Sequence, residues 1–281
     1  MSTDATLNAT YEEVMDCAAF IKANYAGEMP KVALVLGSGL NQMADELTDA
    51  VRFPYHGLPN FPTPTVEGHS GVLHLGKLGG TPVAFLQGRV HGYEGQSEQK
   101  LAFATRVMWA IGIETLILTN AAGSLNPEAG PGNLMLITDH INNMGLNPLV
   151  GPNDDRFGPR FKDMTYCWDP KHNDTLRACA KGLDINLFEG VYVGMRGPNF
   201  ETPAEIKMWQ TLGGGAVGMS TIPEALAGHH CGLRICGIST MTNYGAGIMP
   251  EELNHEEVME FGAIAAVNLA KLLTAFINKV G

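Results

Sequence analysis

The stretch L-R-I-C-G-I-S-T-M-T-N-Y-G, residues 233–245, decides the fold of this chain. Its apolar residues form a run of strand length, which is typical of a buried parallel strand. The run leads to Asn243, whose side-chain amide can donate one hydrogen bond and accept another. At the end of a strand, such a residue either caps the turn that follows or binds a ligand at the edge of the sheet.

Apolar runs of the same kind recur along the chain. We predict strands at residues 32–37, 72–78, 82–87, 114–119, 134–138, 187–195 and 216–220, in addition to 233–242. We predict helices at 11–25, after Leu40, at 97–112, at 171–182, from Pro203, from Pro223 and at 254–277. This alternation favours an α/β fold with a mixed, mostly parallel central β-sheet flanked by helices on both faces. Because no linker or repeat interrupts it, we expect one domain over residues 1–281.

The charge balance and the cysteines limit the classes of function. The net charge of −11 argues against a general nucleic-acid or anionic-membrane surface, but it leaves room for a local phosphate pocket. The five cysteines form neither a C-x-x-C motif nor a zinc spacing, so we expect free thiols in a reducing compartment. The first residues lack the features of a signal peptide, and no apolar run reaches the roughly 20 residues of a membrane helix. We therefore expect a cytoplasmic protein.

Polar residues follow several of the predicted strands. In open α/β sheets, ligands bind at the carboxyl ends of the strands, so these positions are candidates for a site. They are Ser38, Asn120, Ser220 and Asn243, joined by the glycine-flanked loops 68–71 and 88–95.

The loop G-R-V-H-G-Y-E-G, residues 88–95, is a candidate for anion binding. Arg89, His91 and Tyr93 stand at i, i+2 and i+4, and an arginine offers a planar fork to a phosphate. The segment G-S-G-L, residues 37–40, lies between a strand and a predicted helix, where backbone amides attract an anion. A solvated loop and a plain glycine-rich turn are the alternatives for these two segments.

Two well-known motifs are incomplete in this sequence. Gln42 stands where a G-x-G-x-x-G dinucleotide fingerprint needs its third glycine. His255 begins N-H-E-E-V, but Met259 occupies the place of the second histidine of H-E-x-x-H, so zinc is not supported. His69 lies in a glycine-flanked loop, where a histidine binds a ligand or is incidental.

Phe200 and Glu201 stand together just before the helix predicted from Pro203. An aromatic face beside a carboxylate suits a purine ring, because the aromatic covers the ring while the carboxylate accepts from ring N–H groups. The alternative is an acidic residue that complements the helix macrodipole.

The motifs G-S-G-L, G-R-x-H-x-Y-E-G, N-A-A-G, G-P-N-F-E-T, G-M-S-T-x-P-E and T-N occur in this order. Together they resemble the trimeric, low-molecular-mass purine nucleoside phosphorylases, from about residue 30 to residue 275. The resemblance implies reversible phosphorolysis of 6-oxopurine (deoxy)nucleosides to a free base and (deoxy)ribose 1-phosphate, in purine salvage. It leaves inosine, guanosine and xanthosine unresolved. It implies no cofactor, because inorganic phosphate is a co-substrate.

Carried over residue by residue, the resemblance assigns three groups of binding residues. The phosphate group is Ser38, His69, Arg89, His91, Ser220 and the backbone N–H of Ala121. The ribose group is Tyr93, Met219 and His255, with His255 near the 5′-hydroxyl. The base group is Ala122, Gly123, Phe200, Glu201, Thr242 and Asn243, and the Asn243 amide faces N7 and O6 of the purine. The resemblance makes four of these catalytic, namely Asn243, His91, Glu201 and His255.

Residues 146–169 are rich in Pro, Gly, Asn and Asp and predict a long loop. Phe157 in this loop resembles the aromatic residue that a neighbouring subunit lends to the sugar pocket in the family. We therefore expect a homotrimer that binds a purine nucleoside and phosphate, with no nucleic-acid or membrane partner.

Some positions depart from the family pattern, and other functions stay open. Asn41, Gly92 and the pair Gly228-His229 replace the family's usual residues, without removing a proposed contact. A methylthioadenosine phosphorylase is one alternative, which an aspartate at position 243 would favour. A non-catalytic nucleoside- or phosphate-binding module is a second. A nicotinamide oxidoreductase is a third, weakened by the interrupted glycine fingerprint.

Overall fold

The computed structural model describes residues 3–37, 39–66, 68–249 and 255–281, and it describes side chains at 10–37, 39–66, 68–249 and 265–281. Its strands are β1 (Val32–Leu36), β2 (Thr48–Pro54), β3 (Val72–Leu78), β4 (Thr81–Gln87), β5 (Thr115–Ser124), β6 (Leu134–Asn142), β7 (Leu187–Gly194), β8 (Gly214–Gly218) and β9 (Arg234–Tyr244). Its α-helices are α1 (Thr3–Ala23), α2 (Glu98–Ile111), α3 (Pro170–Gly182), α4 (Pro203–Thr211), α5 (Ile222–His230) and α6 (His255–Val280). Within the residues described, no helix is long and apolar enough to span a membrane.

The strands form one mixed sheet in the order β2-β3-β4-β1-β5-β8-β7-β6-β9. A further pairing of β5 with β9 joins the end of this order to its middle, so β5, β8, β7, β6 and β9 close into a barrel. Parallel pairings join β1 to β4 and β5, β5 to β9, and β7 to β6 and β8. The remaining pairings, β2–β3, β3–β4, β5–β8 and β6–β9, are antiparallel. The predicted mixed sheet is confirmed.

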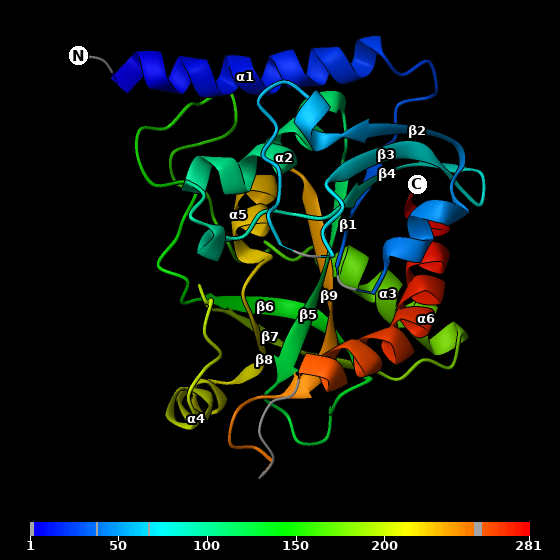
Figure 1. Cartoon of the computed structure of the whole chain (residues 1–281), viewed down its shortest axis with the longest axis vertical. Helices are drawn as coiled ribbons and strands as arrows, with labels where there is room; N and C mark the ends of the chain where they lie inside the picture. The colour runs from blue at the N-terminus through cyan, green and yellow to red at the C-terminus, as the bar shows by residue number, and fades with distance from the viewer. Residues whose placement is uncertain (1–2, 38, 67, 250–254) are drawn as a thin grey trace.

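Helices cover both faces of the sheet, as Figure 1 shows. The side chains of β1 alternate between two cores, because successive residues of a strand point to opposite faces. Ala33 and Val35 belong to the core that α1, α2 and α5 cover. Leu34 and Leu36 belong to the core under α3 and α6. A smaller cluster packs α4 against the barrel through Ile206 and Trp209.

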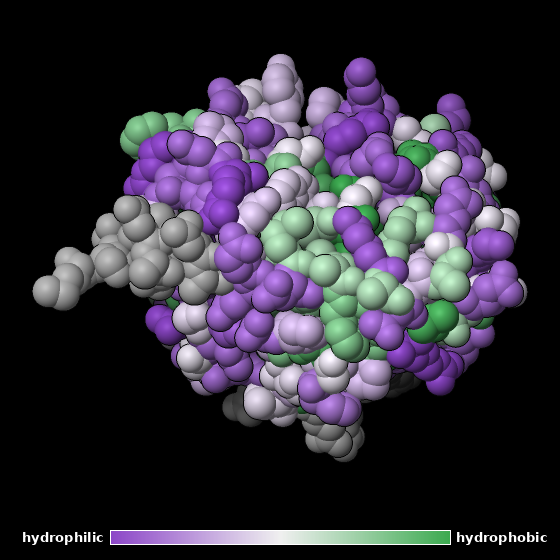
Figure 2. All heavy atoms as spheres, turned by 90° about the horizontal axis from the view of Figure 1, so that it is seen from above, coloured by the Kyte–Doolittle hydropathy of each residue, from purple (hydrophilic) through white to green (hydrophobic). Residues whose placement is uncertain are grey.

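Capping groups set the starts of several helices. Ser97 accepts a hydrogen bond from the backbone N–H of Lys100 at the start of α2, and Thr202 forms a capping box with Glu205 at the start of α4. Figure 2 looks down on α1 and shows a largely hydrophilic face with scattered apolar patches, as the net charge of −11 leads one to expect.

The structure differs from the predicted elements in several places. β2 was not predicted, because most of its side chains are exposed at the edge of the sheet and carry no buried pattern. The segment after Leu40 forms only a short 3-10 helix, Asn41–Glu46. β5 continues to Ser124, past the predicted end at Thr119, and β9 continues to Tyr244. The N-A-A-G motif and Asn243 therefore lie within strands and not in turns after them.

Candidate active site

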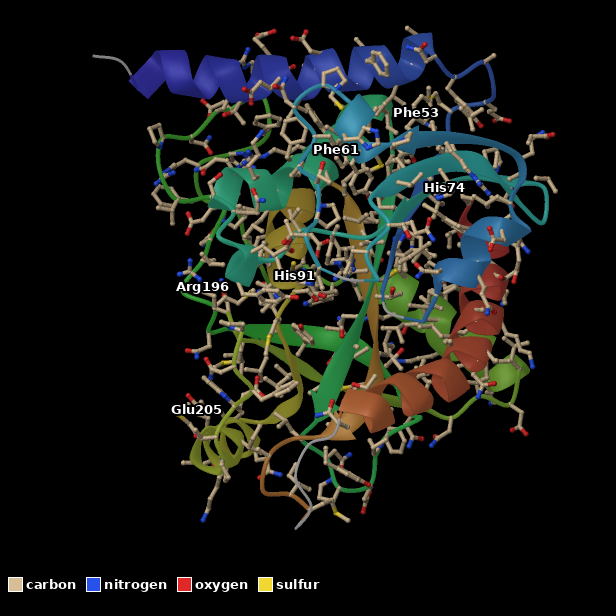
Figure 3. All side chains as sticks on the ribbon, in the orientation of Figure 1. Phe53, Phe61, His74, His91, Arg196 and Glu205 are labelled. Carbon is tan, nitrogen blue, oxygen red and sulfur yellow. The ribbon has the colours of Figure 1, made fainter. Side chains whose placement is uncertain are left out.

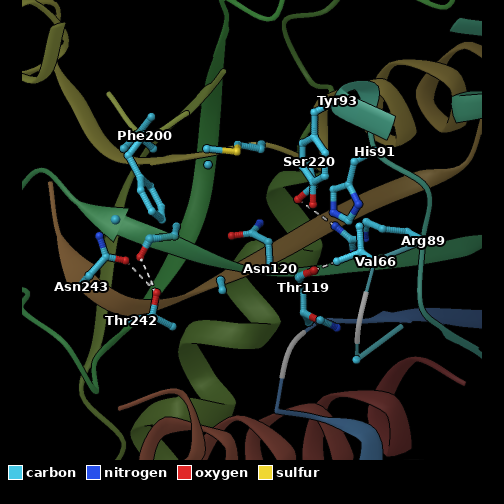
Figure 4. A pocket seen from close by; sticks show the side chains of 18 of the residues that line it. Val66, Arg89, His91, Tyr93, Thr119, Asn120, Phe200, Ser220, Thr242 and Asn243 are labelled. Carbon is cyan, nitrogen blue, oxygen red and sulfur yellow. Dashed lines mark hydrogen bonds between the residues drawn. The ribbon is translucent and has the colours of Figure 1, made fainter. Parts of the chain in front are cut away.

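A cavity of about 690 Å³ opens where β4, β5, β8 and β9 end, beside the loop that follows β1 and the loop that precedes β3 (Figure 4). It is lined by Gly37, Val66, Gly68, His69, Arg89, His91, Tyr93, Thr119, Asn120, Ala121, Ala122, Gly123, Phe200, Glu201, Val217, Gly218, Met219, Ser220, Thr242 and Asn243. The site therefore lies at strand ends, as predicted from the polar residues found there. His91 lies near the middle of the molecule, whereas Arg196 and Glu205 lie toward the periphery (Figure 3).

Most of the predicted site residues meet in this one cavity. The structure brings together His69, Arg89, His91, Tyr93, Ala121, Ala122, Gly123, Phe200, Glu201, Met219, Ser220, Thr242 and Asn243. Ser38 and the side chain of His255 lie outside the described residues. Phe157 lies elsewhere in the fold.

Arg89 forms the cationic end of the cavity and is almost fully buried. Its NH2 group donates to the carbonyl of Thr119 at 2.6 Å, and its NH1 group lies 3.0 Å from Ser220 Oγ. Its Nε lies 3.4 Å from Oε1 of Glu224, and both side chains are buried. The ion pair holds the guanidinium in place, because an unpaired buried charge is costly. Burial raises the pKa of Glu224, and Arg89 opposes that shift.

Two histidines stand beside Arg89. The rings of His69 and His91 meet edge to face with centroids 5.1 Å apart, and the His91 ring stacks on Tyr93 at 4.8 Å. His69 Nδ1 accepts a hydrogen bond from the backbone N–H of Arg89 at 3.1 Å. His91 Nδ1 lies 3.0 Å from Oε1 of Glu94, which also accepts from the His91 backbone N–H at 2.6 Å. Glu94 therefore fixes both the backbone and the ring of His91.

The protonation states in this half of the cavity follow from burial and from Arg89. Burial, and secondly the charge of Arg89, lowers the pKa of His69 and of His91 to about 4. Burial acts to raise the pKa of Glu94, but hydrogen bonds from Thr65 and His91 outweigh it and lower the pKa. At neutral pH both rings are therefore neutral and Glu94 is ionised. Because an ionised carboxylate only accepts, His91 Nδ1 carries the proton and Nε2 has a free lone pair.

The opposite end of the cavity combines an aromatic ring, a carboxyl group and an amide. Phe200 is 54% exposed, whereas Glu201 is only 9% exposed. Burial, and also the charge of Glu205, raises the pKa of Glu201. Asn243 accepts from Thr242 Oγ1 at 3.0 Å through Oδ1 and donates to the carbonyl of Tyr244 at 2.9 Å through Nδ2. Figure 4 shows Phe200 above Thr242 and Asn243.

A β-bulge lets Thr242 and Asn243 face the cavity together. Along the β5–β9 pairing, Ala122 pairs with Met241 but Gly123 pairs with Asn243, so β9 carries one extra residue. Without the bulge, the two neighbours would point to opposite faces of the sheet. The bulge therefore builds the amide end of the site.

Several residues of the site were not assigned a role from the sequence. Thr221 and Glu224 support Arg89 and Ser220, and the T-x-x-E spacing of a capping box was a signal for them. From the sequence, Asn120 is only a polar residue at the end of a strand, and Glu94 is only part of a motif. Within the described residues, no group of three or more His, Cys, Asp or Glu side chains is placed to hold a metal ion.

The structure corrects the placement of Phe157. This side chain is 5% exposed and packs within its own chain, against Tyr11 and Trp109 and under the guanidinium of Arg106. A ring that a neighbouring subunit receives must be accessible. Phe161, in the same loop, is 90% exposed and meets that requirement.

Comparison with known proteins agrees with this geometry. The family model of the phosphorylase superfamily matches residues 31–278. Purine nucleoside phosphorylase 1 of Bacillus subtilis is 48% identical over 266 residues, which cover 95% of this chain and 98% of the relative. The chain belongs to the purine nucleoside phosphorylases of the phosphorylase superfamily.

Solved structures of other purine nucleoside phosphorylases share the fold. A schistosoma purine nucleoside phosphorylase in complex with hypoxanthine is 36% identical, with a TM-score of 0.90 over 96% of this chain and 98% of that one. Isoform 2 of the Schistosoma mansoni enzyme, in complex with cytosine and ribose-1-phosphate, is 37% identical, with a TM-score of 0.91 over 96% and 97%.

Two of the departures from the family pattern have a packing reason. A methyl group on Gly92 would meet Cδ1 of Leu146, so a bulkier residue there would require the Leu146 side chain to turn away. A methyl group on Gly228 would lie 2.8 Å from Cδ1 of Ile235. The absence of a side chain at Gly228 therefore lets α5 pack close to β9.

Proposed function

We propose that this purine nucleoside phosphorylase cleaves 6-oxopurine (deoxy)nucleosides, with inosine and guanosine as its substrates and xanthosine as a further one. The observation that carries the proposal is the polarity of the cavity, in which one end gathers Arg89, His69, His91 and Ser220 and the other gathers Phe200, Glu201 and Asn243. Phosphate fits the first end and a purine the second, and Tyr93 and Met219 also line the cavity and suit the sugar. The solved complexes of relatives with hypoxanthine, and with cytosine and ribose-1-phosphate, support this division.

The proposed chemistry separates charge between the two ends of the cavity. Cleavage of the glycosidic bond leaves positive charge on the ribose and negative charge on the purine. Phosphate held beside the sugar stabilises the cation and then attacks C1′, while the Asn243 amide stabilises the purine at N7 and O6. Catalysis of this kind depends on alignment and preorganised electrostatics and needs no protein nucleophile.

Each end has a distinct role for its titratable groups. At the anion end, Arg89 supplies the positive charge and the neutral His91 ring offers Nε2 to a phosphate oxygen that carries a proton. At the base end, the raised pKa of Glu201 suits a carboxyl group that shares a proton with the ring N–H of the base. Ser38 and the side chain of His255 lie outside the described part of the structure. Their roles, as a phosphate ligand and as the partner of the 5′-hydroxyl, stay predictions.

We also propose that three chains assemble, with the loop between β6 and α3 at the interface. In support, this loop exposes Val150 by 61%, Phe161 by 90% and Tyr166 by 68%, and an interface would remove this apolar surface from water. Phe161, rather than Phe157, is then the ring offered to the neighbouring sugar pocket. Light scattering should give about three times the chain mass of 30.1 kDa, and the chain mass itself would contradict the trimer.

A substrate panel tests the proposed function. Inosine, guanosine, xanthosine, adenosine and methylthioadenosine are each incubated with the enzyme with and without phosphate, and release of free base is followed. We expect phosphate-dependent release from inosine and guanosine, and little from adenosine or methylthioadenosine. Preference for methylthioadenosine would favour the alternative within the same fold, and no release from any nucleoside would favour a binding module.

A further inference from the structure

A buried hydrogen-bond network lies behind the anion end of the cavity. Thr221 is completely buried, with a φ of 73°, which is a costly conformation for a β-branched residue. Its backbone N–H donates to Glu224 at 3.0 Å, which holds the residue in this conformation. The side chain consequently points at three polar groups of the site: Arg89, Asn120 and Ser220.

The direction of each hydrogen bond around Thr221 follows from its donors. Oγ1 receives NH1 of Arg89 at 3.2 Å and Nδ2 of Asn120 at 2.9 Å, and both of these groups can only donate. They occupy the two lone pairs of the hydroxyl oxygen, so the single Thr221 proton is directed at a neighbouring hydroxyl oxygen. Two such oxygens adjoin it, Ser220 Oγ at 3.0 Å and the Tyr192 hydroxyl, which already accepts from the backbone N–H of Ser220 at 3.3 Å.

The same counting applies to Ser220. Its Oγ accepts from NH1 of Arg89 at 3.0 Å, and the Thr221 proton directed at it occupies the second lone pair. The Ser220 proton then points away from Thr221, toward the cavity that this residue lines or toward the Tyr192 hydroxyl, and an anion in the cavity is the stronger acceptor of the two. A hydroxyl in this state offers a donor to an anion, whereas a proton turned toward Thr221 would leave lone pairs facing the anion.

We propose that Thr221 and Asn120 are positioning residues that fix the Ser220 hydroxyl as a hydrogen-bond donor to the attacking phosphate. Asn120 sets the direction by filling a lone pair of Thr221, and its own Oδ1 has no partner among the described residues. Neither residue needs to touch the phosphate. The proposal rests on the phosphate site of the proposed function.

A double-mutant cycle tests this relay, in which Asn120 and Thr221 act on phosphate only through the Ser220 hydroxyl. KM for phosphate, KM for inosine and kcat are measured for the wild type, Asn120→Ala, Ser220→Ala and the double variant. Loss of one hydrogen bond to an anion should raise the phosphate KM of Ser220→Ala about tenfold or more. Asn120→Ala should raise it by less, with little change in the inosine KM. The double variant should match Ser220→Ala within about twofold, because Asn120 acts only through that hydroxyl. If the phosphate KM of the double variant rises by the product of the two single-variant factors, the relay is overturned.

A second pair of variants tests Thr221 and keeps the proposal falsifiable if one protein fails to fold. Thr221→Val removes the hydroxyl and retains the branched shape, so it should raise the phosphate KM. Thr221→Ser keeps a hydroxyl, so its phosphate KM should be lower than that of Thr221→Val. An equal phosphate KM for these two variants would contradict the relay.

Ser239→Ala is the matched control. Ser239 pairs with Asn120 across β5 and β9, is completely buried, and its hydroxyl has no partner among the described residues. Its loss should leave the phosphate KM unchanged. A wild type without phosphate-dependent base release would sink the proposed function. An active wild type whose Asn120→Ala variant keeps the normal phosphate KM would sink the relay alone.

Discussion

Asn243 reaches the cavity with half of its hydrogen-bonding capacity already used. Its Oδ1 accepts from Thr242 and its Nδ2 donates to Tyr244, so one N–H and one lone pair remain for a ligand. The Tyr244 carbonyl can only accept, so it fixes which side of the amide carries the donor. A purine that gains negative charge as it leaves needs such a donor held in place before the reaction begins.

Removal of that amide should affect the rate more than binding. Loss of one preorganised donor to a developing anion typically costs on the order of 100- to 1000-fold in rate. We expect Asn243→Ala to lose about that factor in kcat on inosine, measured as hypoxanthine release in saturating phosphate. A variant with a near-normal rate would show that the amide has no catalytic role.

The same position should control the choice of base. Asn243→Asp offers a carboxyl group that accepts from a 6-amino group while a proton on its other oxygen donates. We expect the ratio of adenosine to inosine turnover to rise in this variant. An unchanged ratio, in a protein that still folds, would separate base selection from this residue.

At the scale of elements, the site depends on how closely β1 and β5 approach each other. The backbone N–H of Gly37 donates to Thr119 Oγ1 at 2.8 Å, just before β5 presents Asn120 and Ala121 to the cavity. A Cβ at position 37 would lie 3.0 Å from the carbonyl oxygen of Thr119 and 3.1 Å from the N atom of Asn120. Both are backbone atoms, which cannot turn aside.

Gly37→Ala should therefore strain the strand pair. Overpacking of this kind costs about 1–3 kcal/mol of the free energy of unfolding, which urea denaturation measures. Gly57→Ala is the control, because a Cβ there has no atom within 4 Å. Equal stabilities for the two variants would mean that the strands move apart freely.

The sequence predicted much of this arrangement, for physical reasons. Buried strands such as β1 and β9 are recognisable in the sequence as apolar runs, and polar residues at their ends, such as Asn243, indicate the site. The exposed edge strand β2 carries no such pattern. The bulge at Thr242 arises from the pairing of distant segments, which no local pattern encodes. The T-x-x-E spacing marks Thr221 as a capping residue but does not indicate its positive φ.

The burial of Phe157 is a further feature that the sequence does not predict. A loop motif indicates that an aromatic residue is present, but exposure is decided by what packs against the ring. Here α1 and α2 cover Phe157 through Tyr11 and Trp109 and leave Phe161 in solvent.

At the scale of the whole molecule, buried neutral histidines tie stability to pH. His172 Nδ1 accepts from Arg234 at 3.2 Å, so its Nε2 carries the proton toward Thr115 at 3.0 Å. Burial, and then the charge of Arg234, lowers the pKa of His172 to about 4. The pKa values of His69 and His91 are lowered to about 4 as well.

These shifts predict loss of stability on acidification. The folded pKa values lie below the unfolded value of about 6.5, so between these limits the unfolded chain binds more protons. Stability should be fully present above about pH 6.5 and should fall as the pH drops toward 4. Thermal melts across this range measure it, and His172→Gln should show a shallower fall. Identical pH profiles for variant and wild type would contradict the role of His172.

The central claim is that phosphate itself attacks the sugar, and oxygen isotopes test it most directly. Inosine is converted in ordinary water with phosphate whose oxygens are all ¹⁸O, and the ribose 1-phosphate is analysed by mass spectrometry. Direct attack on C1′ predicts that the product retains every labelled oxygen, including the one that bridges phosphorus and sugar. A product with an unlabelled bridging oxygen, or hypoxanthine release without any ribose 1-phosphate, would contradict the account.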